Sequence, residues 1–145
     1  MSLTVTQRVE FECGYLIELN GQKQVQSHRY NLEVTVSGNQ RFEDNGYVIE
    51  FETLKKILKS CVPNNKFIFT KNQDYMLPGE RNIADIFDLF GYLSEQVNFR
   101  PTCENLLIWI TDRIQDILDI REPGVRIENA KLRESSTSYA ERKMK

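Results

Sequence analysis

Apolar and polar side chains alternate along the first part of the chain, which is typical of β-strands with one buried face. One run covers residues 5–19, with an interruption near Cys13-Gly14, and places on one face Val9, Phe11, Cys13 and Tyr15. A second run, centred on residues 26–36, places on one face Gln26, His28, Tyr30, Leu32, Val34 and Val36. Asn20-Gly21 between them predicts a hairpin. Because residues 22–26 stay polar, we expect the connection to be longer than two residues.

The spacing changes to a helical period after residue 50. Apolar stripes predict helices over residues 51–61, 83–93 and 102–120, the last with Thr102 as its N-cap. Short β-like runs cover residues 66–70, 97–99 and 125–132, and the polar tail 135–145 is expected to fray. This order predicts one α+β domain, residues 1–145, with an antiparallel sheet and two main helices packed on one face.

Composition narrows the class of protein. The chain has 145 residues, of which 40% are hydrophobic and 28% charged, and a formal net charge of −2. This balance argues against a nucleic-acid or anionic-membrane surface as the main partner. No apolar run approaches the roughly 20 residues that span a bilayer, and no signal peptide is visible. The three cysteines are widely spaced in apolar contexts, which favours reduced thiols and a cytoplasmic protein.

Strand edges predict assembly. An isolated sheet has edges that must be covered or paired. We expect the edges near residues 5–18 and 125–132 to pair with neighbouring copies, so that the protein forms a homo-oligomer.

His28 is the only histidine in the molecule. Its position early on a long strand, after a polar loop, is one where an enzyme could place a metal ligand at the rim of a sheet. The alternative is a half-exposed strand histidine without a chemical role, and an isolated histidine favours this alternative.

Five segments in order resemble the 6-pyruvoyltetrahydropterin synthase / 6-carboxytetrahydropterin synthase family. They are Phe11-Glu12-Cys13-Gly14-Tyr15, residues 26–34, residues 46–55, Pro101-Thr102-Cys103-Glu104-Asn105, and residues 134–140. The resemblance covers nearly the whole chain. It implies the tunnelling fold, with strands arranged as an oligomeric barrel, a homohexamer, and a ligand from pterin or deazapurine metabolism.

The resemblance also implies where a metal would lie. The family binds zinc through three histidines, and the matching positions here are Tyr15, Gln26 and His28. Tyrosine titrates near 10 and a glutamine amide is a weak donor, so this set predicts no tightly bound zinc. Cys13 shares the face of Tyr15 and could join His28, but a buried strand cysteine is the favoured interpretation.

The family's proton-handling positions are replaced as well. The cysteine position falls on Gln22, and the Asp-His pair falls on Asn64-Asn65. Amides do not exchange protons near neutral pH, so no catalytic residue is assigned.

The family's ligand-binding glutamates are both kept. Glu134 matches the residue that anchors the pterin ring, and Glu104, beside Thr102, matches the glutamate at the start of the last helix. Glu104 could equally be a helix N-terminal charge, and Glu134 could be a surface carboxylate. We expect His28 to have no role at the Glu134 end of the pocket.

Three functions stay open. The first is a protein that binds a pterin- or purine-type ligand through Glu134 and has lost the zinc-dependent synthase chemistry. The second is an active divergent lyase or hydrolase that uses groups such as Tyr15, Cys13, His28 and Glu134. The third is a structural oligomer without a ligand.

Overall fold

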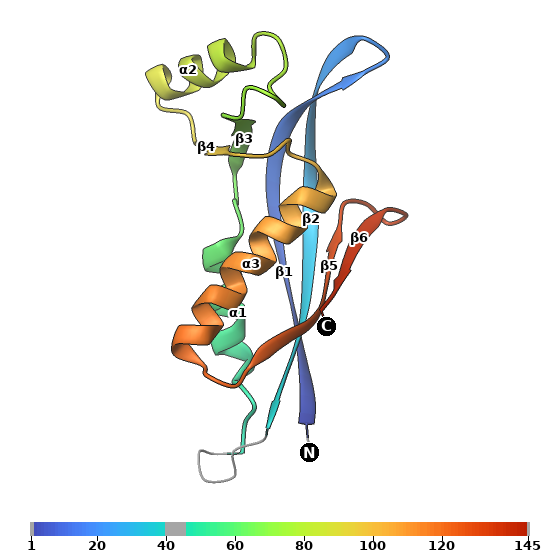
Figure 1. The fold of residues 1–145 in the computed structure, drawn as a ribbon, viewed down its shortest axis with the longest axis vertical. Helices are drawn as coiled ribbons and strands as arrows, with labels where there is room; N and C mark the ends of the chain where they lie inside the picture. Colours follow the sequence, from blue (N-terminus) through green and yellow to red (C-terminus); the bar gives the residue numbers. More distant parts are fainter. Residues whose placement is uncertain (1, 40–45, 145) are drawn as a thin grey trace.

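A long hairpin forms the centre of the molecule in the computed structural model, which describes residues 2–39 and 46–144 (Figure 1). Strand β1 (Ser2–Leu19) pairs antiparallel with β2 (Gln22–Asn39) along its whole length. The turn between them is only two residues long, because Asn20 and Gly21 both adopt positive φ angles, 53° and 77°. This is the geometry that matches the twist of paired strands. The expected longer connection and the expected interruption at Cys13-Gly14 are therefore wrong.

The sheet has six strands in the order β4-β3-β1-β2-β5-β6. The added strands are β3 (Lys66–Thr70), β4 (Ser94–Val97), β5 (Arg126–Arg133) and β6 (Tyr139–Lys143). The sheet is not purely antiparallel, because β3 runs parallel to both β1 and β4. The connections that lead into β3 and β4 each contain a helix, as parallel neighbours require.

Residues 139–143 form a strand, contrary to the expected fraying of the tail from residue 135, while residue 145 lies outside the described residues. Strand β6 pairs with β5 over five positions, from Asn129↔Lys143 to Arg133↔Tyr139. The β5 edge predicted to meet another copy is thus covered by this chain's own β6. The other predicted edge is partly open, since among the described residues β3 pairs only with residues 13–15 of β1.

In the described part of the chain, three helices pack on this sheet. Helices α1 (Phe51–Cys61) and α3 (Cys103–Arg121) lie on one face, and α3 crosses the central hairpin obliquely (Figure 1). Helix α2 (Glu80–Phe90) packs near β3 and β4 at one end. The sequence predicted this helix over residues 83–93, so both of its ends lie three residues earlier than predicted. Strand β4 likewise begins before the strand predicted over residues 97–99. Thr102 caps α3 as predicted, since its hydroxyl accepts a hydrogen bond from the Asn105 amide.

The main core lies between α1, α3 and the face of the hairpin that carries the alternating apolar residues. Its largest fully buried side chains include Tyr30, Phe11, Leu32, Leu106 and Ile110. Each fully buried side chain of this size contributes about 1.5–3 kcal/mol through removal from water. Among the described residues, no helix is long and apolar enough to cross a membrane.

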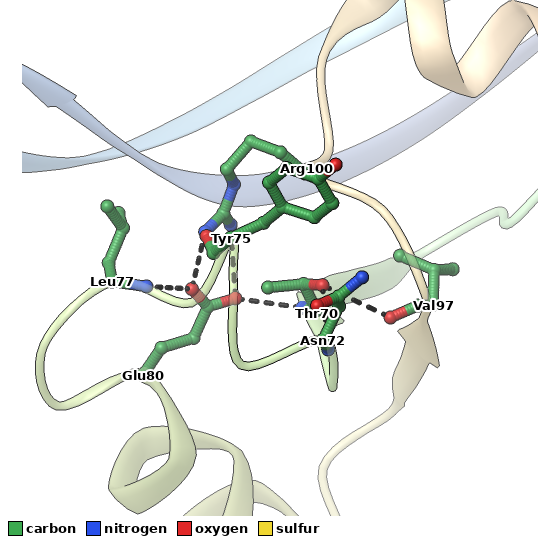
Figure 2. A network of polar contacts seen from close by, with 7 residues as sticks. All are labelled: Thr70, Asn72, Tyr75, Leu77, Glu80, Val97 and Arg100. Carbon is green, nitrogen blue, oxygen red and sulfur yellow. Dashed lines mark hydrogen bonds and ion pairs between the residues drawn. The ribbon is translucent and has the colours of Figure 1, made fainter.

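A buried ion pair holds the region around α2 to the start of α3 (Figure 2). The Glu80 side chain is fully buried, and its two oxygens accept hydrogen bonds from the Arg100 Nη1 and Nη2 atoms at 2.6 and 3.0 Å. The same oxygens accept from the amides of Leu77 and Thr70 at 3.1 and 2.8 Å. Arg100 also donates to the Tyr75 carbonyl. This network fixes the loop between β3 and α2.

Candidate functional site

His28 and Glu134 meet where β2 passes the end of β5. The His28 Nε2 atom lies 2.8 Å from Glu134 Oε1, and the two side chains are 31% and 23% exposed. Glu134 is held in place because its amide donates to the Ser138 carbonyl across the β5–β6 connection. The sequence predicted no role for His28 at the Glu134 end, whereas the structure places its imidazole against this carboxylate. The two residues form one polar centre at the rim of the sheet.

Two contacts of the His28 Nε2 atom indicate its tautomer. Besides Glu134, the Nε2 atom lies 3.2 Å from Gln26 Oε1, so it faces two oxygen acceptors. Nε2 therefore carries the hydrogen, and in the neutral ring Nδ1 carries the lone pair. Within residues 2–39 and 46–144, Nδ1 has no hydrogen-bond partner. The ring edge is also set by an edge-to-face contact with Tyr30 at 5.8 Å.

Two buried phenols extend this centre. Tyr15 stands opposite Gln26 in the β1–β2 register, and the Tyr30 hydroxyl donates to the Tyr15 hydroxyl at 3.3 Å. Burial raises the pKa of both phenols, and the nearby Glu134 carboxylate raises the pKa of each further. Both hydroxyls are therefore protonated near neutral pH.

Two buried thiols lie beside the same polar centre. Cys13 stands opposite His28 in the register, and Cys103 donates to the Leu132 carbonyl at 3.4 Å. Burial, with a smaller effect of Cys103, raises the Cys13 pKa to about 12; burial and then Glu134 raise the Cys103 pKa to about 11. Neither side chain supplies a thiolate near neutral pH, which is the form that acts as nucleophile and metal ligand.

The residues at the family's zinc positions do come together, but they do not fit a zinc ion. Tyr15 is a buried protonated phenol, and Gln26 hydrogen-bonds His28. The Nε2 atom of the one imidazole is already in contact with Gln26 and Glu134. In the described part of the chain, no group of three His, Cys, Asp or Glu side chains is arranged to hold a metal. A catalytic zinc site needs three such ligands.

The three replaced catalytic positions lie elsewhere. Gln22 pairs with Leu19 at the tip of the hairpin, and four residues of strand place it roughly 13 Å from Gln26. The Asn64 Oδ1 atom accepts from the Glu12 amide, and the Asn65 amide donates to the Glu12 carbonyl. Asn64 and Asn65 therefore attach the loop after α1 to β1.

The start of α3 is near the polar centre. The contact of Cys103 with the Leu132 carbonyl joins the first turn of α3 to the end of β5, two residues before Glu134. Thr102 is occupied as the helix cap, and Glu104 is exposed in the first turn. Both positions favour a role in the helix terminus.

A surface hollow lies apart from the polar centre. It has a volume of about 450 Å³ and is lined mainly by the outward side of β1 and by β3 and α2, through Glu12, Gly14, Ser27, Lys66, Phe67 and Phe87. Asn65 and Cys13 also line it, whereas Glu134, His28 and Tyr15 do not. Sequence reasoning assigned no role to Tyr30 in the polar centre, although its place on the face of Gln26 and His28 was a signal.

Comparison with known proteins gives one consistent result. The sequence profile of the 6-pyruvoyl tetrahydropterin synthase family matches residues 4–144. The chain is 27% identical over 115 residues to a dihydroneopterin monophosphate aldolase of Pyrococcus furiosus, covering 79% of this chain and 77% of that protein. It is 26% identical over 89 residues to a 6-carboxy-5,6,7,8-tetrahydropterin synthase of Bacillus subtilis, covering 58% of this chain and 60% of that protein.

The fold agrees with this match. The structure of 6-pyruvoyl tetrahydropterin synthase from Plasmodium vivax superposes with a TM-score of 0.71 at 18% identity, over 99% of each chain. A protein of Wolinella succinogenes superposes with a TM-score of 0.73 at 16% identity, over 100% of this chain and 99% of that one. With these folds and the profile match, the chain belongs to the 6-pyruvoyl tetrahydropterin synthase family of pterin-metabolising proteins, and its fold is the tunnelling fold.

Proposed function

We propose that the protein binds a pterin- or purine-type ligand through Glu134 and does not carry out the family's zinc-dependent synthase chemistry. The observation that carries this proposal is the state of the Glu134 carboxylate. It is partly buried and held by its backbone, and His28 contacts only Oε1. Among the described residues Oε2 has no hydrogen-bond partner. The carboxylate therefore keeps acceptor capacity for a ligand.

The chemistry of the ligand follows from the carboxylate. A ring N–H beside an amino group offers two parallel donors, which suit the two oxygens of one carboxylate. Each carboxylate oxygen has two lone pairs, so Oε1 can accept from His28 and from a ligand at once. A charge-assisted hydrogen bond contributes roughly 1.5–3 kcal/mol, against about 1 kcal/mol for a neutral one. Pterins and guanine both carry this pair of donors.

Calorimetry with neopterin, sepiapterin and guanine tests the proposal. Glu134→Gln keeps the size of the side chain but replaces an acceptor with a donor, so affinity should fall about tenfold or more, which corresponds to 1.4 kcal/mol. Glu141→Gln is the matched control, because it makes the same charge change on β6 at a carboxylate whose side chain is exposed to a similar extent and also has a basic partner, Lys131. Absence of binding by the parent, or equal binding by parent and Glu134→Gln, would favour the structural-oligomer function instead.

The metal part of the proposal has its own test. The donor set at Tyr15, Gln26 and His28 supports the inference that the purified protein holds no tightly bound zinc. Elemental analysis after dialysis should give much less than one zinc per chain. Stoichiometric zinc that is lost in His28→Ala would contradict the inference.

A second candidate function is lyase chemistry on the side chain of a pterin, and the free Nδ1 atom of His28 favours it. Glu134 and Gln26 direct Nε2 inward, which leaves Nδ1 able to accept a proton. The relative from Pyrococcus furiosus is described as an aldolase. Aldehyde released from dihydroneopterin monophosphate, and abolished in His28→Ala, would establish this candidate. No release at micromolar enzyme over hours would leave the binding function.

We further propose that the chain assembles as a homo-oligomer, with the open part of β1 pairing with another copy. Residues of β1 before Cys13 have no strand partner on the β3 side within the described ranges. Light scattering should give a mass of several chains at micromolar concentration. A stable monomer would refute this part.

A further inference from the structure

The two tyrosines of the polar centre differ in what their hydroxyls do. Tyr30 is fully buried and donates its hydrogen to the Tyr15 oxygen. Tyr15 is only 4% exposed and accepts in this contact, so its own hydrogen must be donated elsewhere. Within residues 2–39 and 46–144 it has no acceptor. A buried donor left unpaired costs about 1–3 kcal/mol, so this hydroxyl is suited to donate to a bound molecule.

The position of Tyr15 is fixed by its neighbours. Tyr30 is stacked on Phe11 with ring centroids 5.3 Å apart, and it holds the Tyr15 oxygen through the hydroxyl contact. Across the strands Tyr15 faces Gln26, which contacts His28, which contacts Glu134. The Tyr15 hydroxyl and the Glu134 carboxylate therefore belong to one continuous polar centre, whose members are held before any ligand binds.

We propose that the Tyr15 hydroxyl donates a hydrogen bond to an oxygen atom of the ligand whose N–H groups are accepted by Glu134. This inference rests on the proposed function and adds a second recognition element to it. The carboxylate accepts hydrogen bonds from donor groups of the ligand, and the phenol hydroxyl donates a hydrogen bond to an acceptor atom of the ligand. Oxo-heterocycles with an amino group, such as pterins and guanine, carry donors and an acceptor oxygen together.

The consequence is a preference for the oxygen-bearing ligand. An analogue with an amino group in place of the ring carbonyl presents a donor to a donor, and the buried hydroxyl would lose its partner. Sites that hydrogen-bond a substrate group discriminate strongly against analogues that lack it, because the buried protein group is then unpaired. A neopterin side chain offers hydroxyl oxygens as a second kind of acceptor.

Calorimetry with three ligands tests the inference. The probes are neopterin, 6-methylpterin, which lacks the side-chain hydroxyls, and 2,4-diamino-6-methylpteridine, which also lacks the ring carbonyl. Tyr15→Phe should lower the affinity for neopterin about tenfold. The loss should vanish with one or both of the other ligands, which identifies the oxygen that is bound. Tyr75→Phe is the matched control, because it removes a phenol hydroxyl from an exposed tyrosine outside the polar centre, so it should lower affinity by less than threefold.

The outcomes separate this inference from the proposed function. Equal binding of neopterin by parent and Tyr15→Phe, while Glu134→Gln weakens binding, would overturn the role of Tyr15 alone. An equal loss for all three ligands would also overturn it, because the effect would then be on the shape of the site. No effect of Glu134→Gln would overturn the proposed function itself. Circular dichroism checks that both phenylalanine variants are folded.

Discussion

Glu80 and Glu134 both have a basic partner, but they differ in how many of their acceptor positions are occupied. Glu80 is completely buried, and its oxygens accept four hydrogen bonds, two of them from Arg100. Glu134 is partly exposed, and among the described residues its carboxylate has a single side-chain partner, His28. Each carboxylate has one basic side chain beside it, Arg100 for Glu80 and His28 for Glu134. They differ in burial and in the number of unused acceptor positions.

That difference indicates two roles. A buried charge is tolerated when its partners satisfy it, and removal of one partner is then strongly destabilising. The Glu80 pair has no acceptor left for a ligand, so its role is to hold the loop before α2 against the start of α3. The Glu134 carboxylate contributes little to the stability of the fold, because it is partly exposed and has one side-chain partner among the described residues. Its unoccupied acceptor positions are what the proposed ligand binding requires.

The largest expected effect is on the stability that depends on Glu80. Glu80→Gln leaves the Arg100 charge without its partner in a buried site, and unfolding free energy should fall by about 3–5 kcal/mol. Urea denaturation followed by circular dichroism measures this. A loss below 1 kcal/mol would break the contrast with Glu134.

A smaller effect on stability is expected at Thr102, which is either a structural helix cap or a contact of the ligand beside Glu134. If its role is the α3 cap seen in the structure, Thr102→Ala should cost about 1 kcal/mol of unfolding free energy. Thr102→Ser keeps the capping oxygen and serves as the control. A tenfold loss of ligand affinity without a loss of stability would instead place Thr102 with Glu134.

Glu134→Gln should change stability less than either of these. The His28 pair is partly exposed, and ion pairs of this kind contribute roughly 0–1 kcal/mol. The same urea measurement applies. A loss near that of Glu80→Gln would show that Glu134 is a structural carboxylate and would remove the basis of the ligand proposal.

The smallest effect concerns Cys103, because burial and, to a smaller extent, the negative charge of Glu134 raise the pKa of its thiol. Its pKa is raised from 9.0 to about 11, first by burial and then by Glu134. Because the folded pKa lies above the unfolded value, its stabilising contribution is complete below pH 9 and is lost as the pH rises toward 11. Glu134→Gln should lower the Cys103 pKa slightly and so speed its alkylation at pH 10, measured by mass spectrometry. Slower alkylation in this variant would contradict the placement of Glu134.

Much of the fold could be predicted, because periodicity reports burial on one face of an element. The first two strands, the helix over residues 51–61 and the Thr102 cap were confirmed. The hairpin turn at Asn20-Gly21 was predicted, but its two-residue length was missed because solvent faces both sides of the hairpin tip, where polar residues carry no alternation. Strand β6 was missed because Tyr139–Lys143 is polar, and only its pairing with β5 makes it a strand.

The site was predicted as positions and not as contacts. Tyr15, Gln26, His28 and Glu134 were each named from strand alternation and the family's motifs, and the structure brings them together at the rim of the sheet. The contact of His28 with Glu134 depends on how the β5–β6 connection folds back, which no local pattern predicts. The Glu80–Arg100 pair was missed for the same reason, because it joins an α2 residue to a loop far along the chain.

The Asn20-Gly21 turn also bears on how quickly the protein folds. Pairs in the β1–β2 hairpin are close in sequence at the turn and become more distant step by step, from Leu19↔Gln22 outward. Each new pair therefore closes only a small additional loop. By contrast, Cys13↔Lys66 and Asn31↔Arg133 join distant segments. The hairpin is the part able to form first by zippering, and it would present β1 and β2 as templates on which the slower, non-local strands assemble.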